Sequence, residues 1–309
     1  MNERQAQIAK ASWVSIIGNA FLSASKIAIG IIAGSLAVVG DGIESASDII
    51  TSIITLVTAH ILAKPPNKKF PFGYEKADTI ATKALSFVIF FAGAQLTIST
   101  ISRLFEDVSR ELPSMLAIYI TIVSIFGKLF LSYYQRKIGK KVESAMLLAN
   151  SKNMQNDVII SLSVLVGLAF TFIFKLPVID TITALAVSIW IMYSAYRIFM
   201  KSNIELMDGV EDQELYTLIF KAISDIKGVY NPHRLRIRKI GFRHMIEIDI
   251  EVDGSITVCE AHTIACNVED KIKETVRNVY DIVVHIEPYG IKEPDEKFGV
   301  SNQQINKKP

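Results

Sequence analysis

Six long apolar runs follow one another through the first two thirds of the chain. They cover about residues 11–33, 37–62, 79–104, 113–135, 147–174 and 178–200. Each run is long enough to cross the hydrocarbon core of a bilayer as a helix, which needs about 20 residues. Glycine, serine and threonine recur within several runs, as in membrane helices that pack closely on one another. The pattern therefore predicts an α-helical membrane protein with six transmembrane helices within residues 1–203.

After residue 204 the pattern changes to short amphipathic segments. In order, it predicts a helix, two strands, a second helix and a third strand at residues 208–229, 233–241, 243–254, 257–279 and 281–290. The order α-β-β-α-β is typical of a small ferredoxin-like α+β domain, which we expect over residues 204–290. Residues 291–309 are too polar to bury a core, and we expect a disordered tail there.

Composition agrees with one membrane part and one soluble part. Half of the 309 residues are hydrophobic and the mean hydropathy is +0.34, yet 21% of the residues are charged. The net charge of +2 does not decide whether nucleic acid is a partner, but the sequence has no arginine-rich stripe or nucleic-acid motif that would indicate one. The polar N-terminal segment lacks the short apolar core and cleavage site of a signal peptide. Cys259 and Cys266 fit free thiols in a reducing compartment.

The basic residues near the ends of the runs indicate the orientation. If the six helices are threaded alternately, one side receives most of them: Arg4, Lys10, Lys64, Lys68, Lys69, Lys76, Arg136, Lys137, Lys140, Lys141, Arg197 and Lys201. The other side has chiefly Arg103, Arg110 and Lys175. Because basic loops stay in the cytoplasm, we expect a multi-pass protein of the cell membrane with both termini cytoplasmic.

Three carboxylates interrupt the second apolar run. Asp41, Glu44 and Asp48 are spaced i, i+3, i+7 and therefore share one helix face. An ionised carboxylate inside a bilayer costs about 2.5–3.5 kcal/mol unless a positive group compensates it. The fifth run repeats the pattern, because aligning Asp157 with Asp48 places Asn153 on Glu44. The recurrence predicts one divalent cation enclosed by four oxygen-bearing side chains, Glu44, Asp48, Asn153 and Asp157.

Two points about this predicted site stay open. Asp41 is expected either to tune the ligands from behind or to guide the ion towards them. The alternative interpretation of Asn153 and Asp157 is that they cap or solvate the start of a helix near the cytoplasmic surface.

Lys26, Lys83 and Lys128 also lie within apolar runs. Lys26 and Lys83 either reach the membrane surface with their long side chains or face the bundle interior. The sequence leaves the role of Lys128 open, and one interpretation is that it pairs with one of the site carboxylates when the ion is absent.

Four of the five histidines fall in the C-terminal part, namely His233, His244, His262 and His285, with Asp249 and Glu287 near them in the strand pattern. A single histidine is more often an ordinary surface or hydrogen-bonded residue than a ligand. Here His285 and Glu287 share one face of the last strand, and His233 opens the first strand. Because of this convergence, a second, cytosolic metal site is as good an interpretation as ordinary surface or hydrogen-bonded histidines.

Together these features resemble the cation diffusion facilitator family. The segments SLAVVGDGIESASD and NSKNMQNDVIIS stand where that family places its transport site, PFGYEKAD resembles its loop after the second helix, and HRLRIR, EAHTIA and VVHIEP resemble its cytosolic landmarks. The resemblance covers about residues 8–290. It implies a homodimeric exporter, not an enzyme, that moves a divalent metal out of the cytosol in exchange for protons.

The resemblance also assigns roles outside the transport site. Five residues match positions where relatives bind regulatory metal: His233, Asp249, His262, His285 and Glu287. Lys76 and Asp208 match a salt bridge that links the loop to the cytosolic domain at the dimer interface.

Departures from the family pattern concern the choice of metal. Asn153 stands where zinc-transporting members typically have histidine, and Glu44 where aspartate or histidine is usual. An all-oxygen ligand set favours harder ions, so we expect Mn²⁺ as the cargo, with Fe²⁺, Co²⁺ and Zn²⁺ as alternatives. Asn67, Phe70 and Tyr74 replace the ligands of a loop site that some members have, and we expect that loop site to be absent.

Two other classes of protein compete with a transporter. A membrane metalloenzyme is disfavoured because the sequence has no HExxH pair, nucleophile elbow or phosphate loop. A membrane-anchored metal sensor without transport would use the histidine-bearing domain, but it would not need duplicated carboxylates within the spans. A zinc- or iron-selective exporter of the same family is the nearest alternative.

Overall fold

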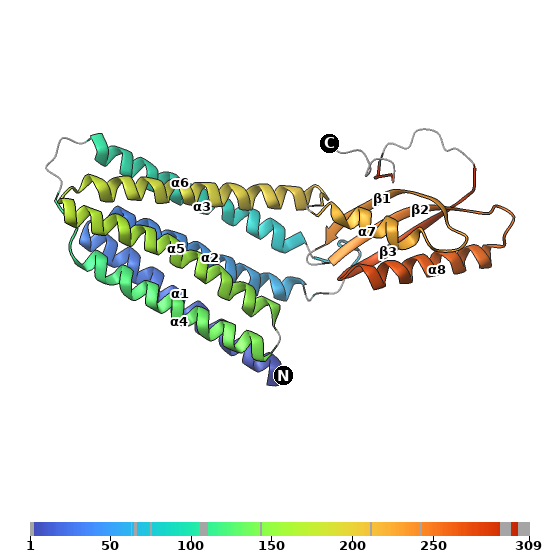
Figure 1. Cartoon of the computed structure of the whole chain (residues 1–309), viewed down its shortest axis with the longest axis horizontal. Coiled ribbons are helices and arrows are strands. Elements are labelled where there is room, and N and C mark those ends of the chain that lie inside the picture. Colours follow the sequence, from blue (N-terminus) through green and yellow to red (C-terminus); the bar gives the residue numbers. More distant parts are fainter. Residues whose placement is uncertain are drawn as a thin grey trace. The chain divides into compact units, whose positions relative to one another are not determined.

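The computed structural model (Figure 1) describes residues 3–62, 64, 67–74, 76–105, 111–142, 144–210, 212–240, 243–290 and 298–301. The chain divides into two compact units. A helical unit consists of Met1–His60 and Ala81–Phe199, and an α/β unit consists of Ile61–Ile80 and Met200–Pro309. The division at residue 199 lies close to the predicted boundary at 203, but the loop after the second helix belongs to the α/β unit.

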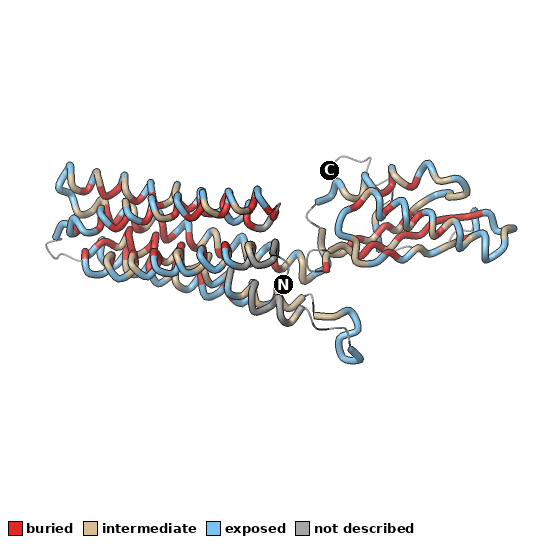
Figure 2. The backbone as a smooth tube through the Cα atoms, turned by 90° about the horizontal axis from the view of Figure 1, so that it is seen from below, coloured by how far each residue is buried: buried red, intermediate tan, exposed pale blue. Residues whose placement is uncertain are grey.

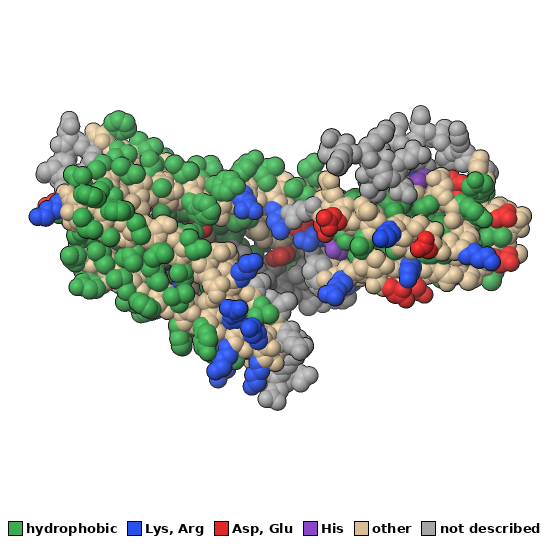
Figure 3. Space-filling model, in the orientation of Figure 1, with side chains coloured by type: hydrophobic (Ala, Val, Ile, Leu, Met, Phe, Trp, Pro, Cys, Tyr) green, Lys and Arg blue, Asp and Glu red, His purple; other side chains and the backbone are tan. Residues whose placement is uncertain are grey.

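All six predicted runs are helical. The helices are α1 (Glu3–Ala33), α2 (Leu36–Leu62), α3 (Lys76–Phe105), α4 (Leu116–Lys141), α5 (Ala145–Phe174) and α6 (Val178–Leu206). Among the described residues, five of them, all except α2, contain a segment long and apolar enough to cross a membrane. Large apolar side chains on the outer faces are exposed, and Figure 3 shows how they cover the helical unit. Such an apolar exterior suits contact with lipid.

The interior of the helical unit is formed by one face of each helix, seen as the buried stripes in Figure 2. Its apolar core includes Val38, Leu85, Leu168 and Ile191. Close approach of α1 and α2 depends on Gly42, because a Cβ atom there would lie 2.6 Å from Cγ1 of Ile27. A glycine at this position therefore lets the neighbouring side chains of α1 reach those of α2.

A tight hairpin joins α1 and α2. Gly34 has φ +73°, a backbone conformation that favours glycine. The first turn of α2 is capped from α6, since Asp180 accepts hydrogen bonds from Ser35 Oγ at 2.6 Å and from Leu36 N at 3.1 Å. A buried carboxylate at a helix N-terminus satisfies free N–H groups and complements the helix dipole. Asp180 thus fixes the end of the helix that carries the carboxylates.

Replacing Asp180 by alanine is expected to destabilise the helical unit by about 1–3 kcal/mol, because one buried and one half-buried donor lose their acceptor. Thermal unfolding of the purified protein in nanodiscs measures this as a lower melting temperature. The matched control is Asp225→Ala on the exposed surface of the α/β unit, which should leave the midpoint unchanged. Equal midpoints for both variants would contradict a stabilising cap.

The α/β unit has the predicted α-β-β-α-β order. Its elements are α7 (Glu214–Ile223), β1 (Tyr230–Ile240), β2 (Arg243–Val252), α8 (Val258–Thr275) and β3 (Val279–Pro288). The strands lie in the order β1-β2-β3, with β1 antiparallel and β3 parallel to β2. Alternate residues of β2, among them Ile246 and Ile248, pack against α7 and α8 through Phe220 and Val268. The opposite sheet face carries the charged residues of the strands.

Helix α8 begins with a capping box. Thr257 Oγ1 accepts a hydrogen bond from Glu260 N, and the Glu260 side chain accepts one from Thr257 N at 2.8 Å. Hydrogen bonds from the Thr257 backbone and side chain lower the pKa of the Glu260 carboxyl. This cap sets the start of α8 and hence the face on which its histidine lies.

The predicted disordered tail falls largely outside the described residues, which include only 298–301 of it. This short segment pairs with β1, where Leu235 and Val300 exchange hydrogen bonds of 3.1 and 3.0 Å. Gly299 has φ +99°, and a Cβ atom there would lie 2.7 Å from the Arg234 Cα. The described part of the tail is therefore ordered by backbone pairing, which polar composition does not predict.

Candidate metal sites

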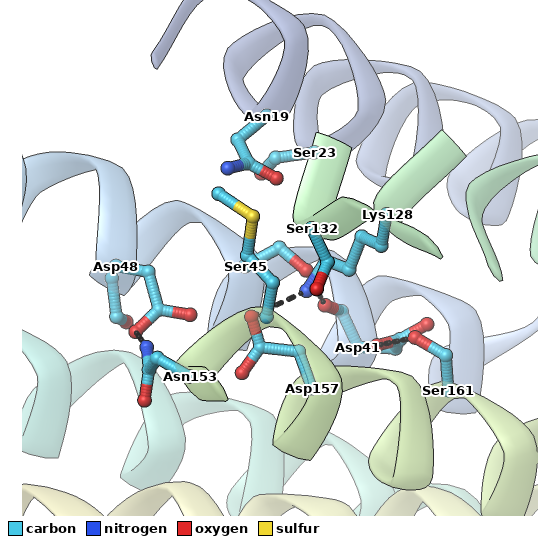
Figure 4. A network of polar contacts seen from close by, with 12 residues as sticks. Asn19, Ser23, Asp41, Ser45, Asp48, Lys128, Ser132, Asn153, Asp157 and Ser161 are labelled. Carbon is cyan, nitrogen blue, oxygen red and sulfur yellow. Dashed lines mark hydrogen bonds and ion pairs between the residues drawn. The ribbon is translucent and has the colours of Figure 1, made fainter. Parts of the chain in front are cut away.

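The predicted ligands of α2 and α5 face each other in the helical unit (Figure 4). Asn153 Nδ2 donates a hydrogen bond of 3.3 Å to Asp48 Oδ1. Asp48 also interacts electrostatically with Asp157, which lies one turn after Asn153 on α5. The i, i+4 spacing on both helices thus brings three of the four predicted ligands together.

Glu44, the fourth predicted ligand, interacts electrostatically with Asp157 and Asp41. Its Oε2 atom is buried and has no hydrogen-bond partner among the described residues. A buried carboxylate oxygen without a partner is costly, and a bound cation removes that cost. The donor set therefore fits a divalent cation, and it consists of carboxylate and amide oxygens, which suit hard ions.

Lys128 of α4 is paired with the predicted site. Its Nζ lies 2.9 Å from Asp157 Oδ2, and its side chain is only 2% exposed. The expectation that Lys128 pairs with a site carboxylate is confirmed. An ammonium group inside the bundle partly offsets the cost of burying this carboxylate.

Lys26 of α1 faces the interior and forms a second buried ion pair. Its Nζ lies 2.8 Å from Asp41 Oδ2, and both side chains are at most 1% exposed. Ser161 of α5 links the pair to the other helix, because it accepts from Lys26 Nζ at 3.0 Å and donates to Asp41 Oδ1 at 2.8 Å. Lys26 Nζ also donates to Ser45 Oγ at 3.3 Å. Asp41 therefore lies behind the ligands, held by α1 and α5.

Lys83, in contrast, belongs to neither pair. Its Nζ lies 5.1 Å from the ring centroid of Phe199, a cation–π contact between α3 and α6.

A second group of ligating side chains lies on the charged face of the sheet. Ligand atoms of His233, Asp249 and Glu287 all lie within 4.8 Å of one another, and the three residues are buried. Glu287 is shared, since His233 Nε2 and His285 Nε2 lie 3.4 Å from its two carboxylate oxygens. One nitrogen and two carboxylate ligands, with a second histidine beside them, fit a transition-metal ion.

The backbone around His233 orients its ring. His233 Nδ1 lies 2.7 Å from the carbonyl oxygen of Asn231, so a proton on Nδ1 leaves the lone pair on Nε2, the nitrogen that faces Glu287, to bind a metal. Asn231 and Arg234 have φ of +36° and +48°, and the pairing of β1 with β2 shifts register on both sides of His233. Such unusual backbone conformations are concentrated at functional sites. Here they turn the histidine towards Asp249 and Glu287.

The structure brings four of the five predicted residues together and places an arginine beside them. Within the described part of a single chain, His262 lies apart from the group, because it lies on α8, which packs against the opposite face of the sheet, so its part in the site stays a prediction. Its Nε2 is instead 3.6 Å from Cys266 Sγ, one turn further along α8. Arg234 was missed by sequence reasoning, yet its Nη1 lies 2.7 Å from Asp249 Oδ2. A register shift within β1 cannot be read from an alternating pattern, and it is this shift that brings Arg234 to Asp249.

Replacing His233 by alanine is expected to reduce the metal-induced stabilisation of the protein. A ligand present at 100 times its dissociation constant stabilises by about 2.7 kcal/mol, and this gain requires an intact site. The measurement compares melting temperatures of the full chain with and without added Mn²⁺ or Zn²⁺. His244→Ala is the control, because His244 lies outside the group of metal-ligating side chains. If the His233→Ala protein kept the full metal-induced increase in melting temperature, this site would be excluded.

The other predicted residues lie within the α/β unit. Lys76 Nζ is 2.7 Å from Asp208 Oδ1, and both side chains are 42% exposed, so the pair fixes geometry more than it adds stability. In the loop, Asn67 Nδ2 donates to the Tyr74 hydroxyl at 2.6 Å, and the rings of Phe70 and Tyr74 are 4.7 Å apart. These side chains hold the loop together.

Comparison with known proteins gives matches over both units. The family model described as "Cation efflux transmembrane domain" matches residues 12–207, and "Cation efflux protein, cytoplasmic domain" matches residues 212–289. The manganese efflux system protein MneS of Bacillus subtilis is 31% identical over 89% of this chain and 93% of its own length. Magnetosome protein MamB of Magnetospira is 25% identical over 90% and 94%. The solved metal-bound C-terminal domain of the CzcD transporter from Thermotoga maritima is 36% identical over 26% of this chain and 93% of its own, with a TM-score of 0.25.

Proposed function

Since this chain belongs to the cation diffusion facilitator family of cation efflux transporters, we propose that it exports Mn²⁺ from the cytosol in exchange for protons. The observation that carries the proposal is the group of facing side chains on α2 and α5, in which Asp157 is buried and Glu44 and Asp48 are half-buried. Buried carboxylates of this kind are tolerated inside a bilayer only when cations neutralise them. We place the protein in the cell membrane, with both termini cytoplasmic.

In this mechanism the ligands alternate between metal and protons. Mn²⁺ arrives from the cytosol and binds Glu44, Asp48, Asn153 and Asp157 with the carboxylates deprotonated. Helices α2 and α5 then move together, so that the site opens to the other side of the membrane. Protons compete there for the carboxylates, the metal leaves and the protonated form returns. Asn153 takes no proton, so the coupling rests on Glu44, Asp48 and Asp157.

Manganese is favoured by the chemistry of the ligands. Asn153 offers an amide oxygen where a histidine nitrogen would favour zinc. Two similar proteins, MneS and MneP of Bacillus subtilis, bear the name manganese efflux system protein. The cation-efflux pump FieF of Serratia proteamaculans is also similar, at 27% identity, so Fe²⁺, Co²⁺ and Zn²⁺ are the competing cargoes.

The α/β unit has a regulatory role in this proposal. His233, Asp249 and Glu287, with His285 beside them, bind a divalent metal on the charged face of the sheet. The matched cytoplasmic-domain family supports assembly into a homodimer through this unit. We assign the Lys76–Asp208 ion pair to holding the loop near that dimer interface.

Reconstitution into proteoliposomes tests the function directly. With a pH-sensitive dye inside the vesicles, addition of Mn²⁺ outside should move Mn²⁺ in and protons out, so the lumen becomes more alkaline. A membrane-anchored metal sensor would bind Mn²⁺ without changing the internal pH. Repeating the assay with Zn²⁺, Fe²⁺ and Co²⁺ identifies the cargo, and a larger response to Zn²⁺ than to Mn²⁺ would contradict the assignment of the metal.

A further inference from the structure

Two lysines and four carboxylates form one electrostatic cluster in the helical unit. Lys128 pairs with Asp157, and Lys26 pairs with Asp41. The two ion pairs are not independent, because Lys26 interacts electrostatically with both Lys128 and Asp157. Glu44 and Asp48 each interact with Lys128 and Asp157 as well. The six charged groups therefore act on one another within the same buried volume, part of which is shown in Figure 4.

The formal charge of this cluster follows from its members. Four carboxylates, Asp41, Glu44, Asp48 and Asp157, and two ammonium groups, Lys26 and Lys128, leave a charge of −2 when all six are ionised. One divalent cation brings that sum to zero. A monovalent ion leaves a negative charge in a medium of low dielectric constant, and a trivalent ion leaves a positive one, and both are unfavourable there.

We propose that Lys26 and Lys128 set the valence of the ion that the site accepts, with Lys128 holding Asp157 as a tethered counter-ion until the metal displaces it. This inference rests on the proposed transport function. The contacts assign different parts to the two lysines: Lys128 touches a predicted metal ligand, whereas Lys26 touches Asp41 behind the ligands.

The geometry supports displacement of Lys128 in particular. Its ammonium group lies 2.9 Å from Asp157 Oδ2, where it occupies a position that a metal bound to that oxygen needs. Its flexible four-carbon stem lets the ammonium group move off Asp157 Oδ2 while it stays among the other carboxylates, so the charge of the cluster is unchanged. Lys26 is held more firmly, by Asp41 at 2.8 Å and by the hydroxyls of Ser45 and Ser161. Lys26 therefore stays bound to Asp41, while Lys128 yields its place on Asp157 to the cargo and keeps its charge within the cluster.

Equilibrium binding of Mn²⁺ to the full chain in nanodiscs tests the inference, with free Mn²⁺ followed by its electron paramagnetic resonance signal. Asp157→Asn defines the part of the binding that belongs to the membrane site. Lys128→Gln removes the charge but keeps a hydrogen-bond donor, and it should tighten Mn²⁺ binding at this site ~10-fold or more. In proteoliposomes the same variant should show a KM lowered by a similar factor together with a lower kcat, because release is slowed.

Matched variants separate charge from structure. Lys128→Arg keeps the charge and should bind Mn²⁺ more weakly than Lys128→Gln does, and Lys83→Gln removes a lysine that lies outside the cluster and should have no effect on affinity. Lys26→Gln should also tighten Mn²⁺ binding. An unchanged or weaker affinity in a folded Lys128→Gln protein, or in Lys26→Gln if the former does not fold, would overturn the inference.

A measurement on the wild-type protein tests the inference even if the variants do not fold. At equal concentration, Tb³⁺ should displace Mn²⁺ from the membrane site no better than a divalent ion does, although Tb³⁺ has the higher charge. Displacement of Mn²⁺ by a lower concentration of Tb³⁺ would overturn the role of the lysines. By contrast, wild-type protein that shows no Mn²⁺ binding sensitive to Asp157→Asn would refute the proposed function itself.

Discussion

Replacing Asp157 by alanine is expected to reduce Mn²⁺ transport in proteoliposomes by at least about 100-fold. Loss of a residue that only supports a metal ligand reduces metal affinity or activity by up to about 100-fold, and loss of the ligand itself should cost at least as much. Asp157 is the residue on which the proposed site converges, because it contacts Lys128 and interacts with Asp48 and Glu44. In the proposed mechanism its loss removes a metal ligand and a proton carrier, and it also removes the partner of a buried lysine. Flux should therefore fall for every divalent cargo tested.

Alanine at this position also leaves Lys128 buried without its partner, which costs about 3–5 kcal/mol in typical proteins. Asp157→Asn is the companion variant, since it keeps a polar contact to Lys128 while removing the carboxylate. Asp225→Ala on the exposed surface serves as the control for expression and reconstitution. Wild-type Mn²⁺ flux in a correctly assembled Asp157→Asn protein would remove Asp157 from the mechanism.

The periodicity of the sequence was sufficient to predict which helices bring the candidate ligands to face each other. Carboxylates at i, i+3 and i+7 must share a face of α2, and the matching spacing on α5 predicted the facing pair that Asn153 and Asp48 form. The order of elements in the α/β unit followed equally well from changes of hydrophobic period. Local patterns were enough in these cases because each feature lies on a single regular element.

Partners on different elements were harder to predict. Lys26 and Asp41 lie on α1 and α2, and their contact depends on the close approach at Gly42, which no pattern within either helix shows. Likewise, the separation of His262 from His233 depends on which face of the sheet α8 covers. The backbone conformation around His233 depends on tertiary packing as well. Asn231 and Arg234 have positive φ, and neither residue type requires that conformation, so the sequence alone did not predict it. Contacts set by packing between elements were therefore the part that needed the structure.

Replacing Asn153 by histidine is expected to shift transport from Mn²⁺ towards Zn²⁺ by about tenfold or more, because an imidazole nitrogen is a better ligand for zinc than an amide oxygen. The Asn153 side chain is exposed, so the larger ring can be accommodated without displacing a neighbour from the core. It also lies 3.3 Å from Asp48, close enough for a nitrogen at this position to share a metal with that carboxylate.

The ratio of initial Zn²⁺ and Mn²⁺ fluxes in proteoliposomes measures the shift, and it is independent of how much protein is incorporated. Asn150→His is the matched control, since it places the same ring at an exposed position one turn earlier on α5. If ligand chemistry sets the selectivity, the ratio changes only for Asn153→His. An equal ratio in both variants would mean that Asn153 does not contact the ion, and the preference for manganese would then have to come from the carboxylates and the charge that the two lysines leave on them.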